Sequence, residues 1–222
     1  MIFDDVLELA RSVSHFTIAG EGNVSVRDGD AMLIKASGST LETMTDEDLV
    51  RCDLDGNAFQ GEEKKPSMEV SFHAWILKSF PEINCVCHTH PTNTIKVLCS
   101  GRIHDFAHRR LFPDQVVRNG TVSCVVPYAT PGIPLREEIK KSVEEFIERN
   151  GFFPKLILLK NHGIITASAS VQEAVVSTLM CEKSAEVFIG AKLLNNIQFL
   201  TPQEVAAVDT NPSEKYRREL YQ

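Results

Sequence analysis

The order in which helical and strand-forming segments follow one another limits the folds open to this chain. Residues 23–27 and 31–35 are two short runs of strand formers on either side of Asp28-Gly29-Asp30, which predicts a β-hairpin. Further strands are expected at residues 51–54, 83–89, 121–127, 155–160 and 164–167, and helices at residues 3–13, 67–78, 92–98, 135–149 and 171–194. Ser67 is the expected N-cap of the second helix. Because these elements lack a strict βαβ rhythm, we expect a mixed sheet covered by helices and not a doubly wound parallel sheet.

Length and composition indicate one globular domain. The 222 residues are 43% hydrophobic and 24% charged, which is ordinary for a globular protein with a substantial core. No repeat and no linker rich in Pro or Ser divides them, so a single domain is expected over residues 1–222. With 23 basic against 30 acidic residues, the formal net charge is −7. That sign, without any basic run, argues against nucleic acid or anionic lipid as a partner.

The length of the apolar runs, the N-terminal residues and the cysteines indicate the cellular compartment. No apolar run approaches the roughly 20 residues of a membrane-spanning helix. The N-terminus is acidic at Asp4 and Asp5, where a secretory signal would be basic. Six cysteines occur without a C-x-x-C pair, which is typical of reduced, buried thiols. A cytoplasmic protein is expected.

A His-x-His pair ends one of the predicted strands. Side chains alternate along a strand, so His88 and His90 point to the same face, and Pro91 gives the strand a reason to end there. Two imidazoles so placed can converge on one metal ion. The alternative is a pair of half-exposed histidines without a ligand.

A catalytic metal site needs a third protein ligand, and His162 is the best candidate. It follows a buried strand and precedes Gly163, which permits a tight turn. Three histidines favour Zn²⁺ or a neighbouring divalent ion over Ca²⁺ or Mg²⁺. Glu69 lies at the start of a helix, where an acid can simply complement the helix dipole. His73, four residues on, shares its face and competes as a ligand.

Two glycine-containing loops are candidates for phosphate binding. The segment at residues 20–25 resembles a dinucleotide fingerprint, but Ser25 stands where the third glycine belongs and a strand follows in place of a helix. It is therefore not a Rossmann turn. Residues 36–40 form a small polar loop directly after a strand, a kind of loop that binds phosphate through backbone N–H groups and hydroxyls. Either loop could equally be an ordinary turn.

Taken in order, these pieces resemble the class II aldolase/adducin-head family, which includes fuculose-phosphate aldolase and ribulose-phosphate 4-epimerase. The matching stretches are Gly22-Asn-Val-Ser-Val26, Ile34-Lys-Ala-Ser-Gly38, Lys65-Pro-Ser-Met-Glu69 with Phe72-His73, His88-Thr-His90, Val126-Pro-Tyr-Ala-Thr130 and Asn161-His-Gly163. Each is weak alone, whereas six in the family's order are specific. The resemblance implies an α/β fold of three layers (α/β/α) with a central mixed, mainly antiparallel sheet, and a homotetramer with active sites near subunit boundaries.

Carried over by position, the resemblance also implies the roles of individual residues. His88, His90 and His162 would hold Zn²⁺ (or Mn²⁺ or Co²⁺), and Glu69 would be the acid/base and a further ligand when substrate is absent. The residues implied for phosphate binding are Asn23, Ser37, Gly38 and Ser67. Tyr216 is a candidate to complete a neighbouring subunit's site, and His73 falls outside the family's metal ligands and is set aside as structural.

One position and one segment of the sequence depart from the family aldolases. Met68 replaces a second Ser, which removes a hydroxyl from the phosphate pocket and leaves an unphosphorylated substrate possible. The segment 104–119 also differs, and its His108-Arg109-Arg110 run is either a substituted anion site or a solvated basic turn.

The implied activity is that of a zinc-dependent aldolase. It would cleave a ketose 1-phosphate or a related sugar to dihydroxyacetone phosphate and an aldehyde through a metal-stabilised enediolate. The first alternative is a sugar-phosphate 4-epimerase, which needs an additional acid/base pair, for which Asp114 and Tyr216 are the candidates. The second alternative is a non-catalytic, adducin-like assembly module. A dehydratase is disfavoured, because the family's sulfur-salvage dehydratases lack a glutamate at the position of Glu69.

Overall fold

The structure is a computed structural model that describes the backbone of residues 2–219. Its centre is a seven-stranded sheet with the strand order β3-β2-β1-β4-β7-β6-β5. The strands are β1 (Asn23–Asp28), β2 (Ala31–Lys35), β3 (Leu49–Asp53), β4 (Cys85–Thr89), β5 (Cys124–Val126), β6 (Ile157–Leu159) and β7 (Ile164–Ser168). Only β5 and β6 pair in parallel, and every other neighbouring pair is antiparallel. The predicted mixed, mainly antiparallel sheet is confirmed.

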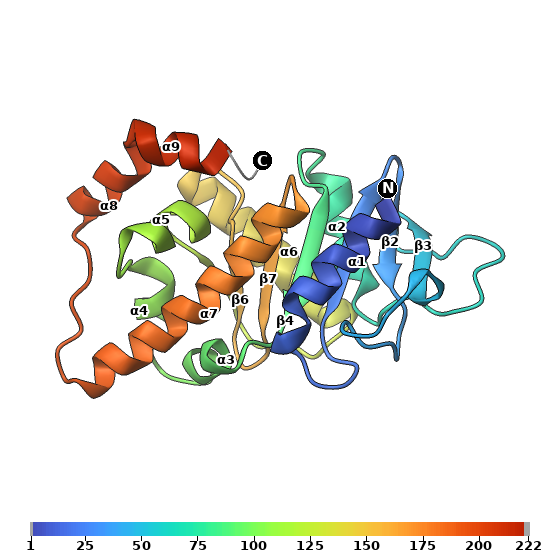
Figure 1. Cartoon of the computed structure of the whole chain (residues 1–222), viewed down its shortest axis with the longest axis horizontal. Coiled ribbons are helices and arrows are strands. Elements are labelled where there is room, and N and C mark those ends of the chain that lie inside the picture. Colours follow the sequence, from blue (N-terminus) through green and yellow to red (C-terminus); the bar gives the residue numbers. More distant parts are fainter. Residues whose placement is uncertain (1, 220–222) are drawn as a thin grey trace.

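Helices cover both faces of the sheet, which gives the predicted three layers (Figure 1). They are α1 (Ile2–Val13), α2 (Val70–Ser79), α3 (Thr92–Leu98), α4 (Ile103–His108), α5 (Pro113–Asn119), α6 (Ile133–Asn150), α7 (Val171–Leu193), α8 (Pro202–Thr210) and α9 (Pro212–Glu219), with short 3₁₀ turns at Ser14–Phe16 and Asp46–Asp48. The helices α1 and α7 pack on one face, and α2 and α6 on the other. None of the helices described is long and apolar enough to cross a membrane.

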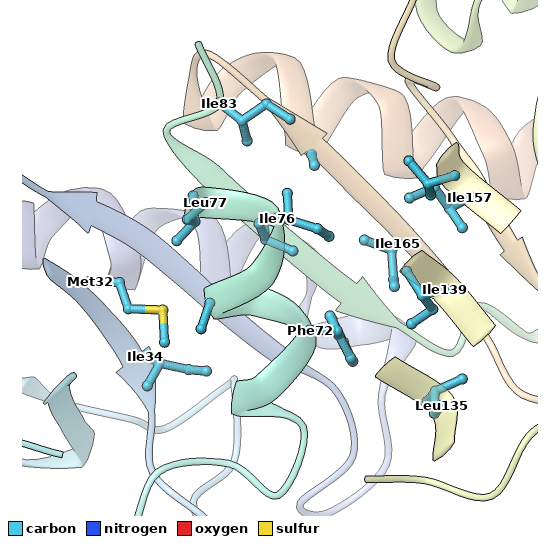
Figure 2. Close-up of a cluster of buried hydrophobic side chains, with 14 of the residues drawn as sticks. Met32, Ile34, Phe72, Ile76, Leu77, Ile83, Leu135, Ile139, Ile157 and Ile165 are labelled. Atoms are coloured by element: carbon cyan, nitrogen blue, oxygen red, sulfur yellow. The ribbon is translucent and has the colours of Figure 1, made fainter. Parts of the chain in front are cut away.

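The core under α2 and α6 joins the two halves of the sheet. Figure 2 shows Phe72, Ile76 and Leu77 of α2 packed over strand residues, and the neighbouring Leu135 and Ile139 of α6 complete the same cluster. These side chains are almost fully removed from water, and burial of each contributes about 1.5–3 kcal/mol. The position of α2 on the sheet is therefore strongly determined, and the residue that precedes α2 is Glu69.

Several elements differ from the sequence expectations, and the strand expected at 155–160 is only the three residues of β6. The helix expected from Ser67 begins at Val70, and the prediction of Ser67 as its N-cap is wrong. Its hydroxyl instead accepts the N–H of Glu69 (3.3 Å), because residues 68 and 69 form a turn before the helix. The strand expected at 121–127 is only the three residues of β5. The short helices α4 and α5 and the C-terminal α8 and α9 were not predicted.

Candidate active site

Alternate residues of β1 turn polar side chains toward α2 in an otherwise apolar layer. Arg27 donates from Nε to Ile83 O (3.1 Å) and from Nη2 to Phe80 O (3.3 Å), so it satisfies carbonyls where the chain leaves α2. Ser25 and Asn23, two and four residues earlier, both contact His73 in the first half of α2. The polar face of β1 thus holds α2 at both ends, and with it Glu69.

The three predicted histidines come together at one end of the sheet. His88 is the fourth residue of β4 and pairs in register with Asn23 of β1, His90 follows the end of β4, and His162 lies in the turn between β6 and β7. One ring nitrogen from each lies within 4.8 Å of the others. The Nε2 atoms of His88 and His90 are 3.0 Å apart.

Glycine at position 163 makes this convergence possible. A Cβ there would lie 2.5 Å from Cδ2 of His90 and 2.6 Å from Thr89 O, closer than real contacts allow. The backbone must therefore be bare where the β6–β7 turn passes the end of β4. The sequence signal was correct, although it indicated only a turn.

Burial lowers the pKa of all three histidines, to about 4 for His90, which favours neutral imidazoles. His88 Nδ1–H donates to Ile164 O (2.8 Å), which leaves a bare electron pair on Nε2. That pair faces Oε2 of Glu69 at 3.3 Å, so two acceptors point at one another. A divalent cation held by these two residues would satisfy both acceptors.

Glu69 completes the donor set. It is 8% exposed, and its Oε1 lies 3.7 Å from His162 Nε2 with no hydrogen-bond partner among the described residues. Burial raises the pKa of Glu69 and the hydrogen bond from the amide of Asn23 lowers it, and the pKa lies below its usual value. Three imidazoles and an ionised carboxylate fit Zn²⁺ or a neighbouring transition metal.

A cavity of about 210 Å³ opens beside these residues. Its walls contain all four residues predicted for phosphate binding, together with Glu69 and two of the histidines: Asn23, Ser37, Gly38, Ser67, Glu69, His90 and His162. His88 lies beneath and is fully buried. Met68 also borders the cavity, but it is 77% exposed and stands at its rim.

Two further wall residues, Lys35 and Glu21, were not identified from the sequence. Lys35 is only 2% exposed, its ammonium donates to Gly20 O (3.2 Å), and burial lowers its pKa. The available signal was a lysine ending an apolar strand directly before a polar loop. The Glu21 carboxylate accepts the N–H of Ile18 (3.0 Å) and lies 3.6 Å from Nδ1 of His90.

Tyr216 and Asp114 do not reach this site within their own chain. Tyr216 lies on α9, which Figure 1 places at the opposite end of the sheet from the start of α3, the helix that follows His90. Its side chain is 62% exposed. Asp114 on α5 pairs with Arg217 of α9 (3.2 Å). Any role for Tyr216 at a site would have to be in another copy of the chain.

The His108-Arg109-Arg110 run is not a solvated basic turn throughout. Arg110 is 1% exposed, and its guanidinium donates to Gly120 O (2.6 Å), Ala107 O (3.0 Å) and Ser123 Oγ (3.0 Å). Every hydrogen-bond partner described for it is a neutral oxygen, as in a structural cap. Arg109 instead stacks over Phe199, with 3.7 Å between its Cζ and the ring centroid.

Comparison with known proteins agrees with this geometry. Residues 5–189 match the family described as Class II Aldolase and Adducin N-terminal domain. The chain is 30% identical over 204 residues to the 3-oxo-tetronate 4-phosphate decarboxylase of Haemophilus influenzae, covering 90% of this chain and 92% of the relative. It is 29% identical over 208 residues to the L-fuculose phosphate aldolase of Escherichia coli K12, covering 93% and 90%.

Solved structures give the same result for the fold. A structure of L-fuculose 1-phosphate aldolase superposes with a TM-score of 0.80 at 23% identity, covering 97% of this chain and 96% of that one. The Escherichia coli protein YgbL superposes with a TM-score of 0.78 at 25% identity, covering 93% and 97%. The chain therefore belongs to the class II aldolase and adducin N-terminal domain family.

Proposed function

We propose that this protein is a zinc-dependent aldolase that cleaves a ketose 1-phosphate to dihydroxyacetone phosphate and an aldehyde. The observation that carries the proposal is that an ionised glutamate, a polar loop, a buried lysine and two of the three clustered histidines line one cavity, with the third histidine buried beside them. This combination serves the two ends of such a substrate, its ketone and its phosphate.

His88, His90 and His162 would hold the metal ion, with Glu69 as a further ligand before substrate binds. When bound, a divalent ion supplies Lewis-acid chemistry that polarises a ketone and stabilises the enediolate left by carbon–carbon cleavage. The acceptors of His88 and Glu69 that face each other at 3.3 Å support this use of the site.

Glu69 moves the proton at carbon. When the C3–C4 bond breaks, the C4 hydroxyl releases its proton as it becomes the aldehyde, and the electron pair of the bond remains with C3. Glu69, ionised at rest, takes up a proton and delivers it to C3, so the proton lost at C4 balances the one gained at C3. In the synthetic direction the carboxylate removes the same proton. Oε2 is held by Asn23 Nδ2–H (2.8 Å), whereas Oε1 accepts no hydrogen bond from the described residues. Oε1 is therefore the oxygen that exchanges the proton.

The other end of the cavity suits a phosphate. Ser37, Gly38, Ser67 and Asn23 contribute small polar groups, and Lys35 adds a cation. The family aldolases have a Ser hydroxyl at the position of Met68. In this chain the ammonium of Lys35 would replace that hydrogen bond to the phosphate by a stronger, charge-assisted one. This favours a phosphorylated substrate over an unphosphorylated sugar.

A second candidate is decarboxylation of a 3-oxo acid phosphate, which the Haemophilus relative favours. There the bond to the carboxylate breaks, CO₂ leaves, and the same glutamate delivers a proton, taken up from water, to the carbon that keeps the electron pair. The 4-epimerase alternative has less support, because Asp114 and Tyr216 lie away from the cavity of their own chain.

We further propose a cytoplasmic homotetramer in which Tyr216 enters a neighbouring copy's site. Support comes from the C-terminal arm, residues 195–217, in which none of the described side chains is buried. Leu193 and Leu194, just before the arm, are 77% and 83% exposed. Packing these exposed apolar side chains against a second copy of the chain would stabilise the arm. The six free cysteines suit a reducing compartment.

Metal analysis of the native protein and of the His88→Ala/His90→Ala variant tests the proposal. We expect near-stoichiometric Zn²⁺ in the native protein and none in the variant, with turnover lowered more than about 1000-fold, because Lewis-acid stabilisation is worth several kcal/mol. Assays of ketose 1-phosphates for dihydroxyacetone phosphate, and of 3-oxo acid phosphates for CO₂, separate the two activities. A native protein that binds no metal after reconstitution is instead the adducin-like assembly module.

A further inference from the structure

A fully buried histidine that the proposed chemistry does not use is linked through one side chain, that of Asn23, to the glutamate that the chemistry does use. His73 is 0% exposed, is stacked on Phe72 (ring centroids 4.6 Å apart), and makes hydrogen bonds at both ring nitrogens. Nδ1 lies 2.7 Å from Ser25 Oγ, and Nε2 lies 2.5 Å from Asn23 Oδ1. Asn23 Nδ2 in turn lies 2.8 Å from Glu69 Oε2. Four side chains thus form one continuous row.

The donor and the acceptor of each hydrogen bond in this row follow from the ionised Glu69 at its end. An ionised Glu69 only accepts, so the amide of Asn23 presents Nδ2–H to it and turns Oδ1 toward His73. Oδ1 also only accepts, so the proton of the neutral imidazole is on Nε2. Nδ1 is then an acceptor, and the hydroxyl of Ser25 donates to it. One consistent set of hydrogen bonds satisfies the whole row.

We propose that His73 is a positioning residue for the reaction, which fixes the amide of Asn23 so that it holds Oε2 of Glu69 and leaves Oε1 free. Without the Nε2–H donor, Oδ1 of Asn23 has no partner, and the amide can rotate and release the carboxylate. The effect on Glu69 is transmitted through Asn23, because His73 itself does not line the cavity. This inference rests on the proposed function for its kinetic consequence, but not for its structural content.

The structural content is tested by NMR of the ring nitrogens in the zinc-loaded protein, labelled with ¹⁵N at histidine. The signal of His73 is identified as the one missing from His73→Phe, a variant that keeps a ring against Phe72. We expect a protonated Nε2 and an unprotonated Nδ1. Replacing Ser25 by Ala should shift the Nδ1 resonance. A proton on Nδ1 overturns the proposal.

The kinetic consequence is tested with two substitutions and a control. His73→Phe should lower kcat about 10- to 100-fold while the three-histidine site keeps its Zn²⁺. His73→Gln, whose amide can donate to Asn23, should recover part of the loss. The control Thr178→Val removes a buried hydroxyl that bonds Thr166 Oγ1 (2.9 Å) on the other face of the sheet. It should lose comparable thermal stability without loss of kcat.

The outcomes separate the two proposals. Wild-type kcat in His73→Phe, or an equal loss of kcat in Thr178→Val, overturns the positioning role. A zinc-loaded wild-type protein that turns over none of the sugar phosphates contradicts the proposed function instead. In that case the ring tautomer of His73 still decides whether the row of hydrogen bonds exists.

Discussion

Two nearly inaccessible cations, Lys35 and Arg110, lie in different halves of the molecule and have different surroundings. The ammonium of Lys35 donates to two backbone oxygens, Gly20 O (3.2 Å) and Ala36 O (3.5 Å), and borders the cavity that contains Glu69. The guanidinium of Arg110 is surrounded by carbonyl and hydroxyl oxygens between α4 and β5. The number of acceptors separates the two roles. All three guanidinium nitrogens of Arg110 donate to oxygens of the packed chain, so Arg110 supports the fold, whereas Lys35 keeps an N–H that no described residue accepts beside the cavity that contains Glu69 and is placed to bind an anion.

The largest effect on stability is expected from replacement of Arg110. Arg110→Met leaves several buried oxygens, including Gly120 O, without a donor. We expect a loss of about 3 kcal/mol in the free energy of unfolding, with little change in the turnover of the folded protein. Urea denaturation and assays at low temperature measure both. The neighbouring, exposed Arg109→Met is the control and should lose less than about 1 kcal/mol. Equal losses in the two variants would remove the distinction.

Lys35→Met should show the opposite pattern. Loss of a charge-assisted contact should raise KM for a phosphorylated substrate about 10- to 100-fold, and stability should stay the same or increase because a desolvated charge is removed. Steady-state kinetics and thermal unfolding check the two parts. The exposed Lys78→Met, far from the cavity, is the control. An unchanged KM would show that Lys35, like Arg110, only supports the fold.

The pH dependence of stability should come from His73, beside the candidate active site, and not from Arg110. Burial lowers the pKa of His73 to about 3 from its usual 6.5, so below pH 6.5 the unfolded chain binds a proton that the folded chain does not. Stability then falls as the pH decreases, by up to about 2 kcal/mol between pH 6.5 and 5. Urea denaturation at pH 7 and 5 should show a smaller loss in His73→Phe. Arg110 stays charged in this range, since burial lowers its pKa only to about 10.

The smallest effect is expected at α8, which with Arg110 borders a second cavity, of about 620 Å³, away from the candidate active site. Thr201 caps this helix by accepting Glu204 N–H (3.2 Å), and the Glu204 carboxylate accepts Thr201 N–H (2.7 Å). Thr201→Ala should cost about 1 kcal/mol of helix stability and leave kcat unchanged. Amide hydrogen exchange in residues 202–210 measures the change. A fall in kcat would link this half of the molecule to catalysis.

Much of the architecture followed from local patterns. The Asp-Gly hairpin became β1 and β2, and the longest predicted helix became α7 within one residue of its expected end. The segment 99–120 was not predicted, because its short helices are held by contacts such as those of Arg110 and not by an apolar periodicity. Ser67 was misassigned as an N-cap, because hydrogen bonding at Ser67 and Asn23 places the turn before α2 and moves the start of the helix to Val70.

The sequence by itself determined the set of chemical groups: the alternation that puts His88 and His90 on one face, the glycine after His162, and the six ordered motifs that identify the family. These are local features, fixed by backbone geometry over a few residues. Only the tertiary structure decided that His162 joins the pair from 72 residues away, that Lys35 lines the cavity, and that His73 holds Glu69 through Asn23. Each of these depends on strand register and helix packing, which are set by long-range burial and not by neighbouring residues.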